Sequence, residues 1–259
     1  MCRLAAYLGP SILLRQFLQD PPHNLIKQSW APREMSGAVM NADGFGLGWY
    51  TGENKPATYL NTQPAWSDVN ITGLAASLDR PLWLGCVRSA TEGQLTGLVN
   101  TQPFVAGNIL YTHNGYVRDF NPAFKTRCHE LLPPEILAGI NGSTDSEFLF
   151  AIMRQQFYEK ADADITPCLL ESLARIEEFI GKGSALLNFI ITDGRLLYAI
   201  RHAINADCPS LYFTTADAAF PEASLVASEC LTGDDHWQIL PEHHLLVVNN
   251  TDKPELVAL

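Results

Sequence analysis

The sequence predicts an α+β fold, in which two regions of strands flank a helical region. Strand patterns fill much of the chain up to Thr112 and return from Leu186 onward. Between them, two segments that begin at Thr144 and Thr166 repeat apolar residues at helical spacing. Because separate runs of strands and helices are typical of α+β proteins, we expect two sheets and two long helices within one domain, residues 1–259.

Strands are expected where short apolar or alternating runs lie between turn residues. Gly9 and the proline after it are expected to end the first strand. Gly46 and Gly48 leave one face of the second strand bare, so that another backbone or a ligand can approach closely. Asp193 and Gly194 predict a hairpin turn. The expected strands are Arg3–Leu8, Asn41–Tyr50, Leu82–Arg88, Asn108–Thr112, Leu186–Thr192, Arg195–Arg201, Leu211–Thr214, Leu225–Ser228 and His236–Val248.

Helices are expected at three places. A short helix covers Ile12–Leu18 and is followed by a long irregular segment, Asp20–Gly37. The first long helix starts after Thr144, which forms a capping-box pattern with Glu147. The second long helix, Thr166–Phe179, has a proline at its first helical position, where the missing N–H costs little.

The composition is that of a globular protein that binds small molecules. Apolar residues make up 47% and charged residues 17% of the 259 residues, which is enough apolar material for a large core. The formal net charge of -11 argues against nucleic acids and anionic membrane surfaces as partners, because both are bound by a basic face.

The cysteines and the start of the chain indicate a cytoplasmic protein. Six cysteines without a Cys-x-x-Cys pair match neither a disulfide framework nor a zinc site, and the adjacent His243 and His244 lack metal-ligand spacing. Leu4–Leu14 lacks the basic start and the cleavage site of a signal peptide. No apolar run approaches the roughly 18 residues of a membrane span. We therefore expect no metal, no other cofactor and no membrane partner.

Cys2 is the most informative residue, because removal of Met1 would leave a thiol and a free α-amine on the same residue. A thiol attacks as its thiolate and needs a neighbouring base to form it near neutral pH. An α-amine, with an ordinary pKa of about 7.7 to 8.0, can be that base. A cysteine after the start methionine can also be a chance occurrence, so other segments have to support this role.

Two segments that close predicted strands could complete a cysteine site. Arg88 could hold a carboxylate in a bidentate pair, although a single arginine is more often a surface residue. His113, Asn114 and Gly115 close another strand. The Asn114 amide and the Gly115 N–H could form an oxyanion hole, whereas Asn-Gly between apolar runs is also the signature of a hairpin turn.

Asp145 is a further candidate, at the front of the first long helix. Capping alone explains Thr144 and Glu147. Asp145 is surplus to that pattern and could accept hydrogen bonds from a substrate ammonium, although the helix dipole also favours aspartate in first turns. The glycines between Asn41 and Trp49 lack the dinucleotide-binding spacing and do not open a helix, so no nucleotide site is expected there.

The segments that hold these candidate residues, taken in their order along the chain, resemble the class II glutamine amidotransferase family of N-terminal nucleophile hydrolases. Asp20–Arg33, Asn41–Tyr50 and Val226–Glu229 are similar, within that family, to the ergothioneine-biosynthesis amidohydrolases of the EgtC type. The resemblance covers most of the chain and implies a four-layer αββα sandwich. The segments that carry the family resemblance are Cys2, Asn41–Trp49, Arg88–Thr91, His113–Gly115 and Thr144–Glu147.

The resemblance also implies a role for each candidate residue. Glu92 departs from the family, in which many members carry histidine, and its charge would lie near a bound carboxylate. The implied roles are Cys2 as nucleophile, with its own α-amine as base, Asn114 and Gly115 as the oxyanion hole, Arg88 and Thr91 as ligands of the substrate α-carboxylate, and Asp145 as the ligand of its α-ammonium.

The expected reaction is hydrolysis of a γ-glutamyl amide through a thioester on Cys2. The EgtC-type segments favour γ-glutamyl-hercynylcysteine sulfoxide as the substrate, with glutathione-type γ-glutamyl compounds as the alternative. Full amidotransferases carry a synthase domain after this one, so a chain of 259 residues is expected to be a stand-alone hydrolase. A glutaminase subunit that supplies a separate synthase, a homo-oligomer, a non-catalytic binding protein and retention of Met1 all stay open.

Overall fold

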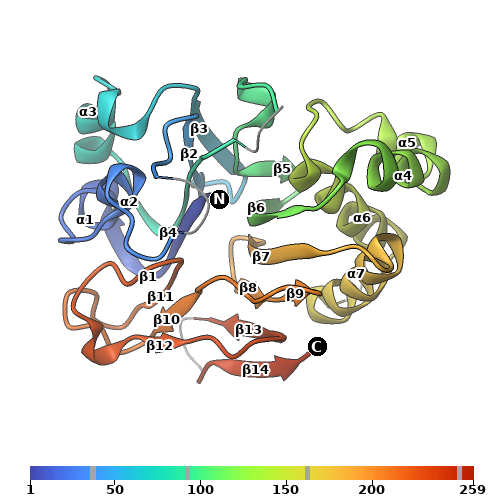
Figure 1. The fold of residues 1–259 in the computed structure, drawn as a ribbon. Coiled ribbons are helices and arrows are strands. Elements are labelled where there is room, and N and C mark those ends of the chain that lie inside the picture. Colours follow the sequence, from blue (N-terminus) through green and yellow to red (C-terminus); the bar gives the residue numbers. More distant parts are fainter. Residues whose placement is uncertain (36–38, 91–93, 161–163, 250–252) are drawn as a thin grey trace.

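Two antiparallel sheets lie face to face at the centre of the molecule, and helices cover both outer faces (Figure 1). This arrangement confirms the four-layer αββα sandwich. Thr91, predicted to bind substrate, and the family departure at Glu92 lie outside the described residues. The computed structural model describes residues 1–35, 39–90, 94–160, 164–249 and 253–259.

Both sheets combine strands from distant parts of the chain. In spatial order, the first sheet consists of β12 (Gln238–Ile239), β10 (Tyr212–Thr214), β11 (Ser224–Ala227), β1 (Arg3–Leu13), β4 (Asp79–Val87), β2 (Phe45–Tyr50) and β3 (Pro56–Asn61). The second consists of β14 (Glu255–Ala258), β13 (His244–Val248), β8 (Leu197–Arg201), β7 (Ala185–Thr192), β6 (Ile109–Val117) and β5 (Phe104–Ala106), and β9 (Ala203–Ile204) also pairs with β7.

Helices from two parts of the chain form the outer layers (Figure 1). None of those in the described ranges is both long and apolar enough to cross a membrane. Beside the first sheet lie α1 (Leu14–Leu18), α2 (Leu25–Trp30) and α3 (Ile71–Ser77). On the other side of the molecule lie α4 (Lys125–Leu131), α5 (Pro134–Leu137), α6 (Asp145–Glu159) and α7 (Ile165–Ile180).

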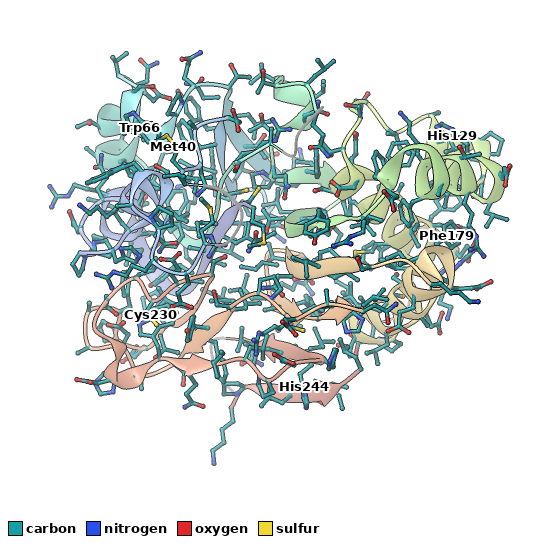
Figure 2. All side chains as sticks on the ribbon, viewed as in Figure 1. Met40, Trp66, His129, Phe179, Cys230 and His244 are labelled. Atoms are coloured by element: carbon teal, nitrogen blue, oxygen red, sulfur yellow. The ribbon has the colours of Figure 1, made fainter. Side chains whose placement is uncertain are left out.

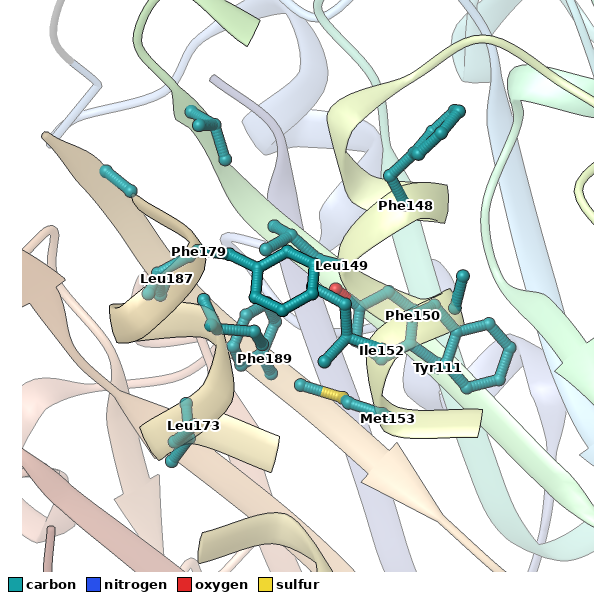
Figure 3. Packing of buried hydrophobic residues seen from close by; sticks show 14 of the residues in the cluster. Tyr111, Phe148, Leu149, Phe150, Ile152, Met153, Leu173, Phe179, Leu187 and Phe189 are labelled. Atoms are coloured by element: carbon teal, nitrogen blue, oxygen red, sulfur yellow. The ribbon is translucent and has the colours of Figure 1, made fainter. Parts of the chain in front are cut away.

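Three layers of buried apolar side chains hold these elements together. One layer fills the space between the sheets, and the other two join each sheet to its helices. Figure 3 shows the layer under α6 and α7, where Tyr111 of β6 stacks on Phe150 of α6 with 4.6 Å between ring centroids. Such close packing fixes α6 against β6.

β1 is a central strand of the first sheet, between β11 and β4. Its side chains alternate, so that Leu4, Ala6 and Leu8 face the second sheet while Ala5 and Tyr7 face the helices. The expectation that a Gly-Pro pair ends this strand is wrong. The pairing with β4 shifts register after Leu8, as at a bulge, and then resumes, which carries the strand to its end at Leu13.

Two further sequence predictions are corrected. The segment expected to be irregular contains α2, whose N-cap Asn24 accepts a hydrogen bond from the Lys27 N–H at 2.9 Å. The hairpin turn considered for Asn114 and Gly115 is wrong, because both residues lie inside β6 and pair with β7. Tertiary pairing therefore overrides the local turn preference of Asn-Gly.

Several other elements agree with expectation. Asp193 and Gly194 turn the chain between β7 and β8, and Gly194 has a φ of +90°. Thr144 caps α6 by accepting the Glu147 N–H at 3.3 Å. The other half of the expected capping box is wrong, because the Glu147 carboxylate accepts N–H groups of Asn141 and Gly142 instead.

Gly46 confirms that the bare face of β2 receives another backbone. A Cβ atom at this position would lie 2.1 Å from the carbonyl oxygen of Gln102. The absence of a side chain thus allows the segment before β5 to pack on β2.

Gly46→Ala should lower the free energy of unfolding by about 1–3 kcal/mol, because the backbone of Gln102 has to move. Gly52→Ala is the matched control: its Cβ would have no atom within 4 Å, and we expect a change below about 1 kcal/mol. Urea denaturation of both variants measures the difference. Equal stability of the two would contradict the packing described for β2.

Candidate active site

Cys2 lies immediately before β1, at the end of the layer between the sheets, and is only 7% exposed. The N-terminus is marked between β4 and β6 in Figure 1. A hydrogen bond from the Cys86 thiol, the positive charges of the chain's amino terminus and Arg88, and the Ser89 backbone N–H together lower the pKa of Cys2, against the opposing effect of burial. The same contact raises the pKa of Cys86, so the pair favours a thiolate on Cys2.

Asn114 points into the same layer from β6. The alternation that brings Leu110 into the layer between the sheets also brings Asn114 there. Its side chain is fully buried, yet neither its Nδ2 nor its Oδ1 has a hydrogen-bond partner among the described residues. Because buried amides are nearly always satisfied, this side chain is suited to a group that a ligand brings.

The Gly115 N–H is directed at the free edge of β6. Along this edge the His113 N–H is bonded to the Gln102 side chain, and the Val117 N–H donates to Asp145 Oδ2 at 2.8 Å. N–H groups alternate between the two sides of a strand, so Gly115, which lies midway, presents its N–H on the same side. The sequence-predicted oxyanion donors are therefore neighbours, one on the face and one on the edge of the same strand.

Glycine is required at position 115 by the neighbouring histidine. A Cβ there would lie 1.8 Å from the Leu186 carbonyl oxygen, which accepts from His113 Nε2 at 2.9 Å. His113 Nδ1 contacts Ser146 Oγ at 2.8 Å, and burial lowers the pKa of His113. A neutral His113 thus ties β6 and β7 to the first turn of α6.

Asp145 is buried at the start of α6. Its Oδ2 accepts the Val117 N–H, and its Oδ1 accepts the Ser146 N–H at 2.9 Å and the Gln94 Nε2–H at 3.3 Å. These bonds fix the carboxylate beside the edge that presents the Gly115 N–H. The role of Asp145 as a ligand of a substrate ammonium stays a prediction.

Arg88 follows β4 and is only 3% exposed. Its contacts are long: 3.4 Å to the Asp43 and Leu95 carbonyl oxygens and 3.5 Å to Gln94 Oε1. Among the described residues it forms no ion pair with a carboxylate, which is unusual for a buried guanidinium. The arrangement leaves Arg88 available for an anion.

A second cluster of polar side chains lies on the other side of β1. Arg3 donates to the Cys2 carbonyl oxygen at 2.8 Å and to Glu229 Oε1 at 3.2 Å, and His23 contacts Glu229 Oε2 at 2.7 Å. Burial opposes ionisation of Glu229, but its hydrogen bonds, led by that from His23, lower its pKa. This network anchors the residue that follows Cys2.

A cavity of about 270 Å³ adjoins this network. It is lined by His23, Arg33, Glu34, Tyr212, Glu229, Cys230 and Trp237, of which Cys230 is labelled in Figure 2. Tyr212 donates its hydroxyl hydrogen to Glu34 Oε2 at 2.9 Å. The cavity thus combines aromatic residues with two glutamates and an arginine.

One group of metal-ligating side chains lies elsewhere: the ligand atoms of Cys208, Glu242 and His243 are within 4.8 Å of one another. The Arg201 guanidinium contacts Glu242 Oε1 at 3.3 Å and so already balances this carboxylate. The group does not require a metal ion for its charge to be compensated.

Cys86, Gln94, His23 and Glu229 were not assigned a role from the sequence. The segments that resemble the EgtC type contain His23 and Glu229, which is the one signal that pointed to them. Cys86 and Gln94 gave none, because their contacts depend on how distant segments pack.

Cys86→Ala should raise the pKa of the Cys2 thiol, because it removes the S–H donor that stabilises the thiolate. Alkylation of Cys2 by iodoacetamide, followed by mass spectrometry of the N-terminal peptide, should then require a higher pH than in the unmodified chain. Cys86→Ser retains a donor and should stay close to the original profile. Identical profiles for the alanine variant and the unmodified chain would refute the role of this contact.

Comparisons with known proteins identify the family. Residues 24–257 match the model for class II glutamine amidotransferases. A γ-glutamyl-hercynylcysteine sulfoxide hydrolase of Mycolicibacterium smegmatis is 30% identical, over 96% of this chain and 96% of that protein. A probable glutamine amidotransferase of Saccharomyces cerevisiae is 28% identical, over 96% of this chain and 82% of that protein.

Solved structures give the same result. A glutamine aminotransferase class-II domain protein from Silicibacter pomeroyi has a TM-score of 0.70 and 25% identity, over 99% of both chains. The glutamine phosphoribosylpyrophosphate amidotransferase of B. subtilis, at 18% identity, shares the fold with a TM-score of 0.67 over 99% of this chain and 49% of that one. The enzyme class expected from the sequence, a hydrolase of linear amides, is confirmed, and the chain belongs to the class II glutamine amidotransferase family.

Proposed function

We propose that this chain hydrolyses a γ-glutamyl amide through a thioester on Cys2. One observation carries the proposal: the Gln94 carboxamide lies between Arg88 and Asp145, accepting from the guanidinium and donating to the carboxylate. The α-carboxylate and α-ammonium of a glutamyl group present the same pair of polarities. A glutamyl head group that displaced Gln94 would form two ion pairs in place of two long hydrogen bonds.

The mechanism follows from the positions of the remaining groups. After Met1 is removed, the Cys2 α-amine takes the thiol proton and the thiolate attacks the γ-carbonyl carbon. The negative oxygen that forms is stabilised by the Asn114 amide and the Gly115 N–H. The α-ammonium of Cys2 then gives its proton to the leaving nitrogen of the substrate as the C–N bond breaks. Water cleaves the thioester, releasing glutamate and restoring the thiol.

γ-Glutamyl-hercynylcysteine sulfoxide is the substrate we favour. We further propose that the chain is cytoplasmic and functions as a single domain, residues 1–259. The names of the mycobacterial relatives support this choice. The cavity beside Glu229 supports it too, because one guanidinium, that of Arg3, separates it from the Cys2 carbonyl. The hercynyl group carries a trimethylammonium, which aromatic rings and a carboxylate bind well. Tyr212, Trp237 and Glu34 would form its subsite.

Asn114→Ala should lower kcat by about 10²–10³, because one oxyanion donor is lost. Its melting temperature should change little, since the buried amide has no partner among the described residues to lose. Glutamate release from γ-glutamyl-hercynylcysteine sulfoxide measures kcat, with Cys2→Ala as the inactive reference. Asn108→Ala, just before the opposite end of β6, is the matched control, and full activity of Asn114→Ala would remove Asn114 from the mechanism.

Glutamate release should be faster with γ-glutamyl-hercynylcysteine sulfoxide than with glutathione or glutamine. Glu34→Gln should raise KM for the hercynyl substrate about three- to tenfold, because the cationic group loses its carboxylate. KM for glutathione, which has no trimethylammonium, should not rise. A preference for glutathione or glutamine in the unmodified chain would instead support the thiol-degrading or the ammonia-supplying alternative.

A further inference from the structure

Asn188 is a second buried amide with an unused atom in the layer between the sheets. It lies on β7 directly opposite Asn114, so both side chains project from the same face of the second sheet. Its side chain is fully buried, and its Oδ1 has no hydrogen-bond partner among the described residues. Two neighbouring strands thus present unsatisfied amide groups side by side.

The direction of the Asn188 side-chain oxygen is fixed by the hydrogen bonds of the nitrogen in the same amide. Nδ2 donates to the carbonyl oxygens of Pro209 at 3.2 Å and Ser210 at 3.1 Å. A rotated amide would place Oδ1 against these two acceptors, so the oxygen has to face away from them. A buried acceptor without a donor is unfavourable, and a bound ligand with an N–H can remove this cost.

The position of Asn188 indicates which part of a substrate brings that N–H. The residues proposed to bind the glutamyl head group lie beyond the free edge of β6, where Val117 and Asp145 meet. Asn188 lies on the other side of Asn114, because β7 is between β6 and β8. With the γ-carbonyl oxygen at Asn114, the amide nitrogen and the leaving group extend toward β7.

We propose that Asn188 Oδ1 accepts the hydrogen bond of the scissile amide N–H and so selects amides over esters. The inference rests on the proposed function. When the α-ammonium of Cys2 protonates this nitrogen and the C–N bond breaks, the N–H stays a donor, so the same bond holds the leaving amine as it departs. An ester oxygen has no hydrogen to donate and gains nothing from Asn188.

The test compares γ-glutamyl methylamide with γ-glutamyl methyl ester as substrates of Asn188→Ala. We expect kcat/KM for the amide to fall about tenfold or more and that for the ester to change less than about twofold. Asn188→Gln keeps both the donor and the acceptor of the amide and should recover part of the lost amide hydrolysis. Melting temperatures identify any variant that does not fold.

Arg201→Gln is the matched control. Arg201 donates to the same Pro209 carbonyl oxygen at 2.8 Å, so its loss loosens the same loop without touching the Asn188 oxygen. This variant should change amide and ester hydrolysis by the same factor. Equal losses on both substrates in Asn188→Ala would overturn the inference and leave the proposed function intact, whereas an unmodified chain that cleaves neither substrate would overturn both.

Discussion

The register of β1 is the constraint on which the site depends. β1 is central in its sheet, and its alternating side chains are packed on both faces. A shift of its pairing register by one residue would turn every side chain to the opposite face and disrupt both buried layers. This alternation places Cys2 between the sheets and Arg3 on the helix side, where Glu229 holds it. The fold therefore fixes Cys2, the proposed nucleophile, by the same packing that stabilises the sandwich. The contact with Cys86 follows, since β4 is the neighbour of β1.

The second sheet supplies the other half of the candidate site, again through strand alternation and packing. β6 presents Asn114 on its face and Gly115 on its edge, and the His113 side chain, on the opposite face, joins β6 and β7 to α6. That contact sets the first turn of α6, and with it Asp145, beside the edge. In the proposed function, a γ-glutamyl amide brings hydrogen bonds to the unsatisfied amides of Asn114 and Asn188 and a charge to Arg88, whose own contacts are long.

Much of this arrangement could be predicted from the sequence, and the failures have physical reasons. Cys2 stood out because it follows the start methionine, and Asp145 because the start of a helix is a local signal. Asn114 was ambiguous, since Asn-Gly prefers a turn until β7 pairs with it. Cys86 and Asn188 could not be found, because their roles arise from strand register and packing between segments far apart in sequence. The resemblance to a family supplied the layer order, which the strand pattern alone did not determine.

The covalent step is the central claim of this account and can be observed directly. Protein mixed with γ-glutamyl-hercynylcysteine sulfoxide and quenched in acid within milliseconds to seconds should show, by intact mass, loss of Met1 and gain of one glutamyl group. Digestion should place that group on the peptide that begins with Cys2. Glutamate release without any mass gain, together with full turnover by Cys2→Ala, would contradict the account.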